Sequence, residues 1–150
     1  MSEHYLTFIP VNPEFVPASD LSAMAKEVFT HLLGGASEIE IVVTEEIAFV
    51  DQGENFEKIQ CPRCGAELST PWWQGAMSRS FESKFRQMDI TTPCCRCATT
   101  LNDLIYIFPA GFARFQLRAR GPKKPQLTPQ EQSQLEQILR TPLKQIWVHY

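Results

Sequence analysis

Apolar residues recur at regular spacing near the start of the chain and predict a strand, a helix and a further strand. Residues 5–11 are rich in β-forming side chains among polar neighbours, which predicts the first strand. Ser19 can begin a helix whose apolar positions are spaced by three and four residues, and two glycines end it. Residues 38–43 alternate strictly. Residues 47–51 form either a second short strand or a continuation of it beyond a bulge.

The same pattern returns in the last third of the chain. Residues 112–120 alternate between apolar and polar side chains, which predicts another strand. Thr128 and Glu131 form a capping box with Pro129 in the first turn, a strong signal for the start of a helix. Residues 144–150 predict a terminal strand.

The order strand, helix, strand, repeated once, is the split βαβ arrangement of ferredoxin-like folds, in which the strands form an antiparallel sheet. We therefore expect an α+β protein with a single domain over residues 1–150. Residues from about 52 to 111 interrupt the pattern and contain all five cysteines. They predict a zinc-ribbon-like insertion in the sheet.

The insertion has its own predicted helix and turn. Thr70 can cap a helix that has Pro71 in its first turn. A short helical turn capped by a threonine is expected over residues 99–106. The apolar stripe of the helix comprises Trp73, Met77, Phe81, Phe85 and Met88.

The composition is that of an ordinary globular protein, with 43% apolar and 21% charged residues. No apolar run is long enough to span a bilayer, so we expect no membrane partner. The first residues show no basic segment followed by an apolar one, and we expect a cytoplasmic, reducing location. In that location clustered cysteines are more often metal ligands than disulfides.

The formal net charge of −3 combines −9 for the first 60 residues with +6 for the rest. A basic half can mark a nucleic-acid surface, and Arg114, Arg118 and Arg120 lie on one face of a predicted strand. Alternatively, these arginines pair with Glu38 and Glu40, because a split βαβ sheet places the two strands side by side.

Two cysteine clusters predict one zinc site. Cys61 and Cys64 enclose a Pro-Arg pair and precede a glycine, which is the form of a zinc knuckle. Cys94 and Cys97 have the same spacing, and the two pairs together offer four thiolates to a tetrahedral ion. Cys95 is the alternative to Cys97 as the fourth ligand. Four thiolates close the coordination shell, so the sequence predicts a structural zinc ion.

Several short motifs are spread over nearly the whole chain. They comprise Asp51-Gln52-Gly53-Glu54-Asn55, the Cys61 knuckle, Trp72-Trp73, Thr92-Pro93-Cys94-Cys95, Leu101-Asn102-Asp103-Leu104, Gly111-Phe112-Ala113-Arg114-Phe115, Pro142-Leu143 and Ile146-Trp147. The set resembles a family of uncharacterised bacterial zinc-ribbon-containing proteins, sometimes labelled sugar-transporter ATPases. The chain has no glycine-rich phosphate loop, so nothing in it supports that label. Family members often carry adjacent cysteines followed by glycine and no counterpart of Cys97, so the resemblance implies Cys95 as an alternative ligand.

We expect a non-enzymatic module that binds another protein, of which an inhibitor or immunity protein is one form. Trp72 and Trp73 are candidate contacts, because one of two adjacent tryptophans usually faces away from the core. The alternative is a nucleic-acid-binding zinc-ribbon protein that uses Arg114, Arg118 and Arg120, although the acidic net charge argues against it.

A third hypothesis is an enzyme that uses Asn102, Asp103 and Arg114. No nucleophile–base pair and no paired carboxylates accompany these residues in the sequence. Asp103 is also typical of a cap or a turn.

Overall fold

The computed structural model describes residues 3–35, 38–53, 56–124 and 126–150. Within them the chain is mixed α+β, with three α-helices and antiparallel strands in three sheets. No helix in this part of the chain combines the length and the apolar character that crossing a membrane requires. The elements are β1 His4–Pro10, α1 Ser19–Leu32, β2 Glu38–Val50, β3 Ile59–Gln60, β4 Glu67–Leu68, α2 Thr70–Phe81, β5 Asp89–Thr91, β6 Ala98–Thr100, the 3-10 turn η1 Leu101–Asp103, β7 Ile105–Tyr106, β8 Gly111–Arg120, α3 Pro129–Leu139 and β9 Leu143–His149.

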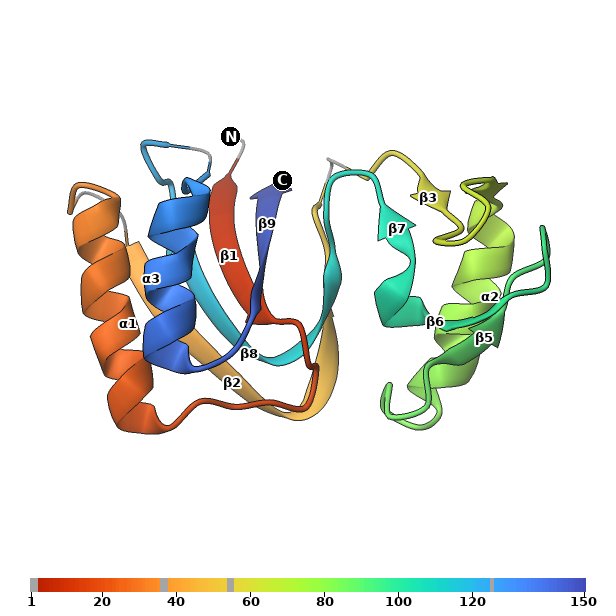
Figure 1. Cartoon of the computed structure of the whole chain (residues 1–150), viewed down its shortest axis with the longest axis horizontal. Helices are drawn as coiled ribbons and strands as arrows, with labels where there is room; N and C mark the ends of the chain where they lie inside the picture. Colours follow the sequence, from red (N-terminus) through yellow and green to blue (C-terminus); the bar gives the residue numbers. More distant parts are fainter. Residues whose placement is uncertain (1–2, 36–37, 54–55, 125) are drawn as a thin grey trace.

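The largest sheet has four strands in the order β2-β8-β1-β9, each antiparallel to its neighbour. Helices α1 and α3 lie side by side on one face of this sheet (Figure 1). The apolar positions of the alternating strands and of the two helices meet there because each element has one apolar face. The resulting core contains Leu6, Phe8, Ala25, Phe29, Leu33, Phe115, Leu117, Ala119, Leu127, Leu135, Leu139 and Leu143.

The predicted capping box of α3 is confirmed. The Oγ1 of Thr128 accepts a hydrogen bond from the N–H of Glu131 at 3.2 Å, and the carboxylate of Glu131 accepts one from the N–H of Thr128 at 2.9 Å. Pro129 is the first residue of the helix, where its missing N–H costs no hydrogen bond. The helix ends where Arg140 adopts the left-handed conformation, with a φ of 59°.

Strand β2 is continuous, which resolves the alternative that the sequence left open. Its register against β8 shifts between Val43 and Ala48, at the position of the predicted bulge. Within the shifted stretch the hydroxyl of Thr44 donates to the carbonyl oxygen of Glu46 at 2.6 Å. Such an irregularity bends a strand and increases its twist, and both β2 and β8 are strongly curved in Figure 1.

The chain between β2 and β8, here called the cysteine segment (residues 51–110), forms a group of small elements at one end of the main sheet (Figure 1). Strands β3, β4 and β7 form a three-stranded sheet, and β5 pairs with β6 as a hairpin. A second core fills the space between these elements and α2. Ile47 of β2 and Phe112 of β8 belong to the same core. The curved ends of β2 and β8 therefore carry the cysteine segment.

Helix α2 is shorter than its apolar stripe predicted. It ends at Phe81, so Phe85 and Met88 lie beyond it. Lys84 and Phe85 have φ values of 59° and 61°, which a right-handed helix does not allow. Phe85 is still buried, because the turn after the helix directs its side chain into the second core.

Two smaller predictions about the same region were also wrong in detail. Ser69 is the N-cap of α2, and Thr70 is already the first helical residue. The stretch expected as one helical turn is divided between β6, the 3-10 turn and β7. The predicted threonine cap is present there, because Thr100 caps the 3-10 turn and accepts a hydrogen bond from the N–H of Asp103.

Candidate metal centre

Two turns that carry the cysteines bring all five thiols together within the cysteine segment. The Sγ of Cys61 lies 3.7 Å from that of Cys95 and 3.7 Å from that of Cys97. The Sγ atoms of Cys64 and Cys94 are 3.4 Å apart. Cys61 and Cys97 are buried, and the other three cysteines are exposed. The cluster thus extends from the second core to the surface.

The first turn, between β3 and β4, has the backbone form that the sequence predicted. The N–H of Gly65 donates to the carbonyl of Cys61 at 3.0 Å, and the N–H of Cys61 donates to the carbonyl of Ala66 at 2.9 Å. Gly65 has a φ of 76°, a conformation that glycine adopts without strain. These bonds close the turn and direct its inner amides at the thiol of Cys61.

The second turn, between β5 and β6, repeats the same pattern of backbone hydrogen bonds. The N–H of Arg96 donates to the carbonyl of Thr92, and the N–H of Thr92 donates to the carbonyl of Cys97, both at 3.0 Å. Arg96 takes the left-handed position, with a φ of 55°. The turn therefore begins at Thr92, two residues before the expected start at Cys94.

The matching backbone pattern pairs the positions of the two turns. Thr92 corresponds to Cys61, and Cys95 corresponds to Cys64. In both turns the first position is followed by proline. This Thr-Pro pair was the signal in the sequence for the register of the second turn. The cysteine spacing hid it because the second turn carries three cysteines, of which only Cys95 occupies a knuckle position.

Four thiols have the arrangement that a metal ion needs. The sulfurs of Cys61, Cys64, Cys94 and Cys95 all lie within 4.8 Å of one another. Cys97, the expected fourth ligand, lies outside this group, although its thiol contacts that of Cys61. Tetrahedral zinc with zinc–sulfur bonds of about 2.3 Å sets its sulfurs about 3.8 Å apart. The observed separations of 3.4 and 3.7 Å fit that geometry closely, so this cluster could hold a metal ion.

Hydrogen bonds favour the thiolate form at two of the four positions. The backbone N–H of Cys64, together with other polar groups of the turns, lowers the pKa of Cys61 to about 5 despite its burial. The hydroxyl of Thr92 lowers the pKa of Cys95, and a backbone N–H adds to the effect. A thiolate is the form that binds metal, so both residues are suited to act as ligands.

The pKa values of Cys64 and Cys97 are instead raised. The backbone N–H of Ala66 lowers the pKa of Cys64, but the adjacent thiol of Cys94, burial and the other thiols raise it to about 12. The hydroxyl of Thr92 lowers the pKa of Cys97, but burial and the neighbouring thiols outweigh it and raise that pKa. Closely packed thiolates repel one another, and a bound divalent cation is what would relieve the repulsion.

The two adjacent tryptophans have different surroundings. Trp73 packs against Phe49 and Phe56, with ring centroids 5.7 and 5.8 Å apart, and its Nε1 donates to the hydroxyl of Tyr106 at 3.3 Å. Trp72 is half-buried and lines a cavity. Trp73 is thus a packing residue, and Trp72 is the one whose ring faces an open space.

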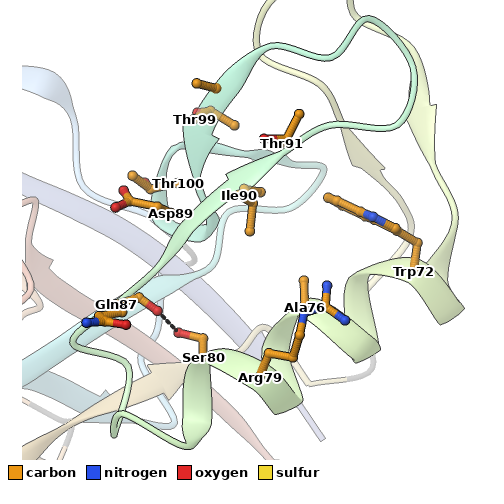
Figure 2. A pocket seen from close by; sticks show the side chains of 11 residues that line it. Trp72, Ala76, Arg79, Ser80, Gln87, Asp89, Ile90, Thr91, Thr99 and Thr100 are labelled. Atoms are coloured by element: carbon orange, nitrogen blue, oxygen red, sulfur yellow. Dashed lines mark hydrogen bonds between the residues drawn. The ribbon is translucent and has the colours of Figure 1, made fainter.

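This cavity of about 1070 Å³ lies between α2 and the β5–β6 hairpin (Figure 2). Trp72 points from the start of α2 toward the hairpin, and Arg79 extends from the same helix. Arg79 and Asp89 form no ion pair with any described residue. The lining comprises Trp72, Ala76, Arg79, Ser80, Gln87, Asp89, Ile90, Thr91, Ala98, Thr99 and Thr100. Sequence reasoning missed this site except for Trp72, because the cavity depends on how the hairpin folds back over α2.

The predicted pairing between β2 and β8 is confirmed. Glu38 lies opposite Arg120 and Glu40 opposite Arg118 in the register of the two strands. The Nε of Arg118 is 3.2 Å from a carboxylate oxygen of Glu40. Arg120 lies 2.6 Å from Glu3 and 4.0 Å from Glu38. Both arginines are therefore neutralised by partners within the chain.

The residues of the enzyme hypothesis are also engaged in local structure. The Nε of Arg114 donates to the carbonyl of Thr44 at 3.1 Å, and the side-chain amide of Asn102 donates to the carbonyl of Val11 at 3.2 Å. Asp103 accepts a hydrogen bond from the threonine that caps its own turn. Asp103 is a turn residue, as the simpler hypothesis predicted.

Comparison of the chain with protein-family models, with curated proteins and with solved structures finds no match. The resemblance to bacterial zinc-ribbon-containing proteins therefore stays a prediction.

Proposed function

We propose that this chain is a structural zinc-binding protein. The observation that carries the proposal is the convergence of thiols from two turns with the same backbone form. Cys61, Cys64 and Cys95 occupy knuckle positions and supply three ligands, and the compact group of four sulfurs points to Cys94 as the next. All the donors are thiolates, which zinc accepts in a closed tetrahedral shell. Cys97 is the candidate that the sequence favoured for the fourth position.

The proposed zinc ion braces the cysteine segment. The first turn joins the three-stranded sheet and the second joins the β5–β6 hairpin, so one ion would tie two small sheets together. Strands of two or three residues have little stability of their own. The main sheet, which we assign to the ferredoxin-like split βαβ class from its strand order β2-β8-β1-β9, would support this zinc-ribbon-like insertion.

The proposal predicts the metal content of purified protein. We expect one zinc ion per chain by elemental analysis. Cys95→Ser should lose it, because that thiol has the place of Cys64 in the second turn, whereas Cys97→Ser should retain it. Cys64→Ser is a matched loss control, since its thiol is exposed like that of Cys95. Wild-type protein without metal under reducing conditions would disprove the zinc-binding function.

The braced segment supports a role in binding another protein. Among the described strands the β5–β6 hairpin is a two-stranded sheet, so each of its strands has one edge that no other strand covers. An extended peptide can pair with such an edge. Trp72 offers an aromatic surface in the adjacent cavity, and Arg79 and Asp89 offer charges of both signs. We assign the cavity to an extended segment of a partner protein with both acidic and basic side chains.

Capture from native cells tests this assignment. Immobilised wild-type protein should retain a specific partner, and Trp72→Ala should lose it. Phe81→Ala is the control, because Phe81 is 59% exposed at the other end of α2 and does not line the cavity. Equal capture by wild type and Trp72→Ala would place the partner elsewhere.

The nucleic-acid alternative has less support, since Arg118 and Arg120 are ion-paired within the chain.

A further inference from the structure

Thr92 occupies the position of a knuckle cysteine. Its backbone has the place of Cys61 in the second turn, and the residue is fully buried. The Oγ1 of Thr92 lies 3.8 Å from the Sγ of Cys61, 3.7 Å from that of Cys95 and 3.3 Å from that of Cys97. A neutral hydroxyl is not among the side chains that usually bind zinc. The two knuckles together therefore offer three thiolates, and the fourth must come from outside the knuckle positions.

Two thiols are candidates for the fourth ligand, because each lies within 4 Å of a different knuckle sulfur. Cys94 is exposed and 3.4 Å from the sulfur of Cys64. Cys97 is buried and 3.7 Å from the sulfur of Cys61. Cys97 is additionally fixed by Thr92, whose hydroxyl accepts from the N–H of Cys97 at 3.2 Å and donates to its thiol. Each candidate thus lies beside the sulfur of a different cysteine of the first knuckle.

We propose that Cys61, Cys64 and Cys95 bind the zinc ion at all times, and that Cys94 and Cys97 exchange at the fourth position. This inference rests on the zinc-binding function proposed above. When Cys97 binds, the sulfur of Cys94 leaves; the incoming thiol releases one proton and the departing thiolate takes up one, so charge and atoms balance. The exchange alternates the free thiol between a buried residue and an exposed one while the metal stays bound.

Cobalt substitution of serine variants tests the exchange, because Co²⁺ replaces zinc and its sulfur charge-transfer absorption reports the number of bound thiolates. Cys94→Ser and Cys97→Ser should each bind one ion with the absorption of four thiolates. The double variant should retain three thiolates and bind the ion at least about 100-fold more weakly. Loss of a hydrogen-bond partner of a ligand costs up to about 100-fold in metal affinity, and loss of a ligand itself should cost at least as much. Adding Thr92→Cys to the double variant should restore the four-thiolate absorption and the tight binding, because it places a fourth thiol at a knuckle position.

The outcomes separate this inference from the zinc-binding function itself. If one single variant binds as weakly as the double variant, the fourth ligand is fixed and the exchange is disproved. If the double variant binds like wild type, neither thiol is a ligand, and the inference fails in the same way. Restoration by Thr92→Cys shows that weak binding did not come from misfolding. Failure of wild type to bind Co²⁺ or Zn²⁺ would instead remove the zinc-binding function.

Discussion

The start of α3 depends on side-chain hydrogen bonds of Thr128 and Glu131. Removing the cap with Thr128→Ala should lower the free energy of unfolding by about 1 kcal/mol, measured by urea denaturation. Thr30→Ala is a suitable control, because Thr30 is also helical and its hydroxyl donates to the carbonyl of Lys26 in the same helix. Equal losses for the two variants would contradict a specific role for the cap.

Glu131 makes the stability of the fold depend on pH. Its hydrogen bond with Lys124, and then the N–H of Thr128, lower the pKa of its carboxyl group below the ordinary 4.5. A carboxyl with a lowered pKa stabilises the fold above pH 4.5, and the contribution disappears as the pH falls through the folded-state value. Glu131→Gln should therefore flatten the decline of stability as the pH falls below 4.5. An unchanged pH profile would show that another group causes the decline.

Residue types explain which parts of the metal centre were predictable. The first knuckle was predictable because Gly65 supplies the positive φ that the turn requires. The second turn places Arg96 at that position, so its sequence lacks the glycine signal. Its buried first position is Thr92, whose one signal in the sequence is the proline that follows it, and the backbone hydrogen bonds establish the register. The choice between Cys95 and Cys97 depends on the same bonds and could not be made from spacing.

At the scale of elements, the cysteine segment should depend on metal far more than the main sheet does. Structural zinc contributes on the order of 10–16 kcal/mol in small zinc peptides, and strands β3 to β7 are each two or three residues long. Chelation should therefore remove hydrogen-exchange protection from these strands. Strands β1 and β9 serve as internal controls, because their buried residues Leu6, Phe8 and Leu143 belong to the first core, which contains no cysteine. Unchanged protection after complete metal removal would contradict a structural role.

The long strands and helices were predicted well because the apolar residues of each recur at one regular spacing. The alternation in β8 and the capping box of α3 specify these elements locally. The prediction made helix α2 too long, because Phe85 keeps the helical spacing of the apolar stripe but reaches the core from a turn with left-handed backbone conformation. The short strands of the cysteine segment have two or three residues, too few for any period to be detected.

At the scale of the whole molecule, Phe112 joins a strand of the main sheet to the second core. It belongs to β8, is fully buried, and has ring centroids 5.1 Å from those of both Phe49 and Phe85. Phe112→Ala should lower the free energy of unfolding by about 3–5 kcal/mol. We expect far-ultraviolet circular dichroism and tryptophan fluorescence to report the same lowered transition. Phe108→Ala is the control, because Phe108 is 47% exposed. Separate transitions would show that the cysteine segment unfolds independently.

The pairing of Val50 with Gly111 has a consequence for the chain's conformational entropy. Residues 51–110 are formally the loop of a hairpin between β2 and β8. Closing a loop costs only about 0.6 kcal/mol more for each doubling of its length, so a very long loop is tolerated. An ion that joins the two turns would divide this loop into shorter closed pieces. The length of the segment can therefore change through insertions or deletions with little effect on how the strands of the main sheet find one another.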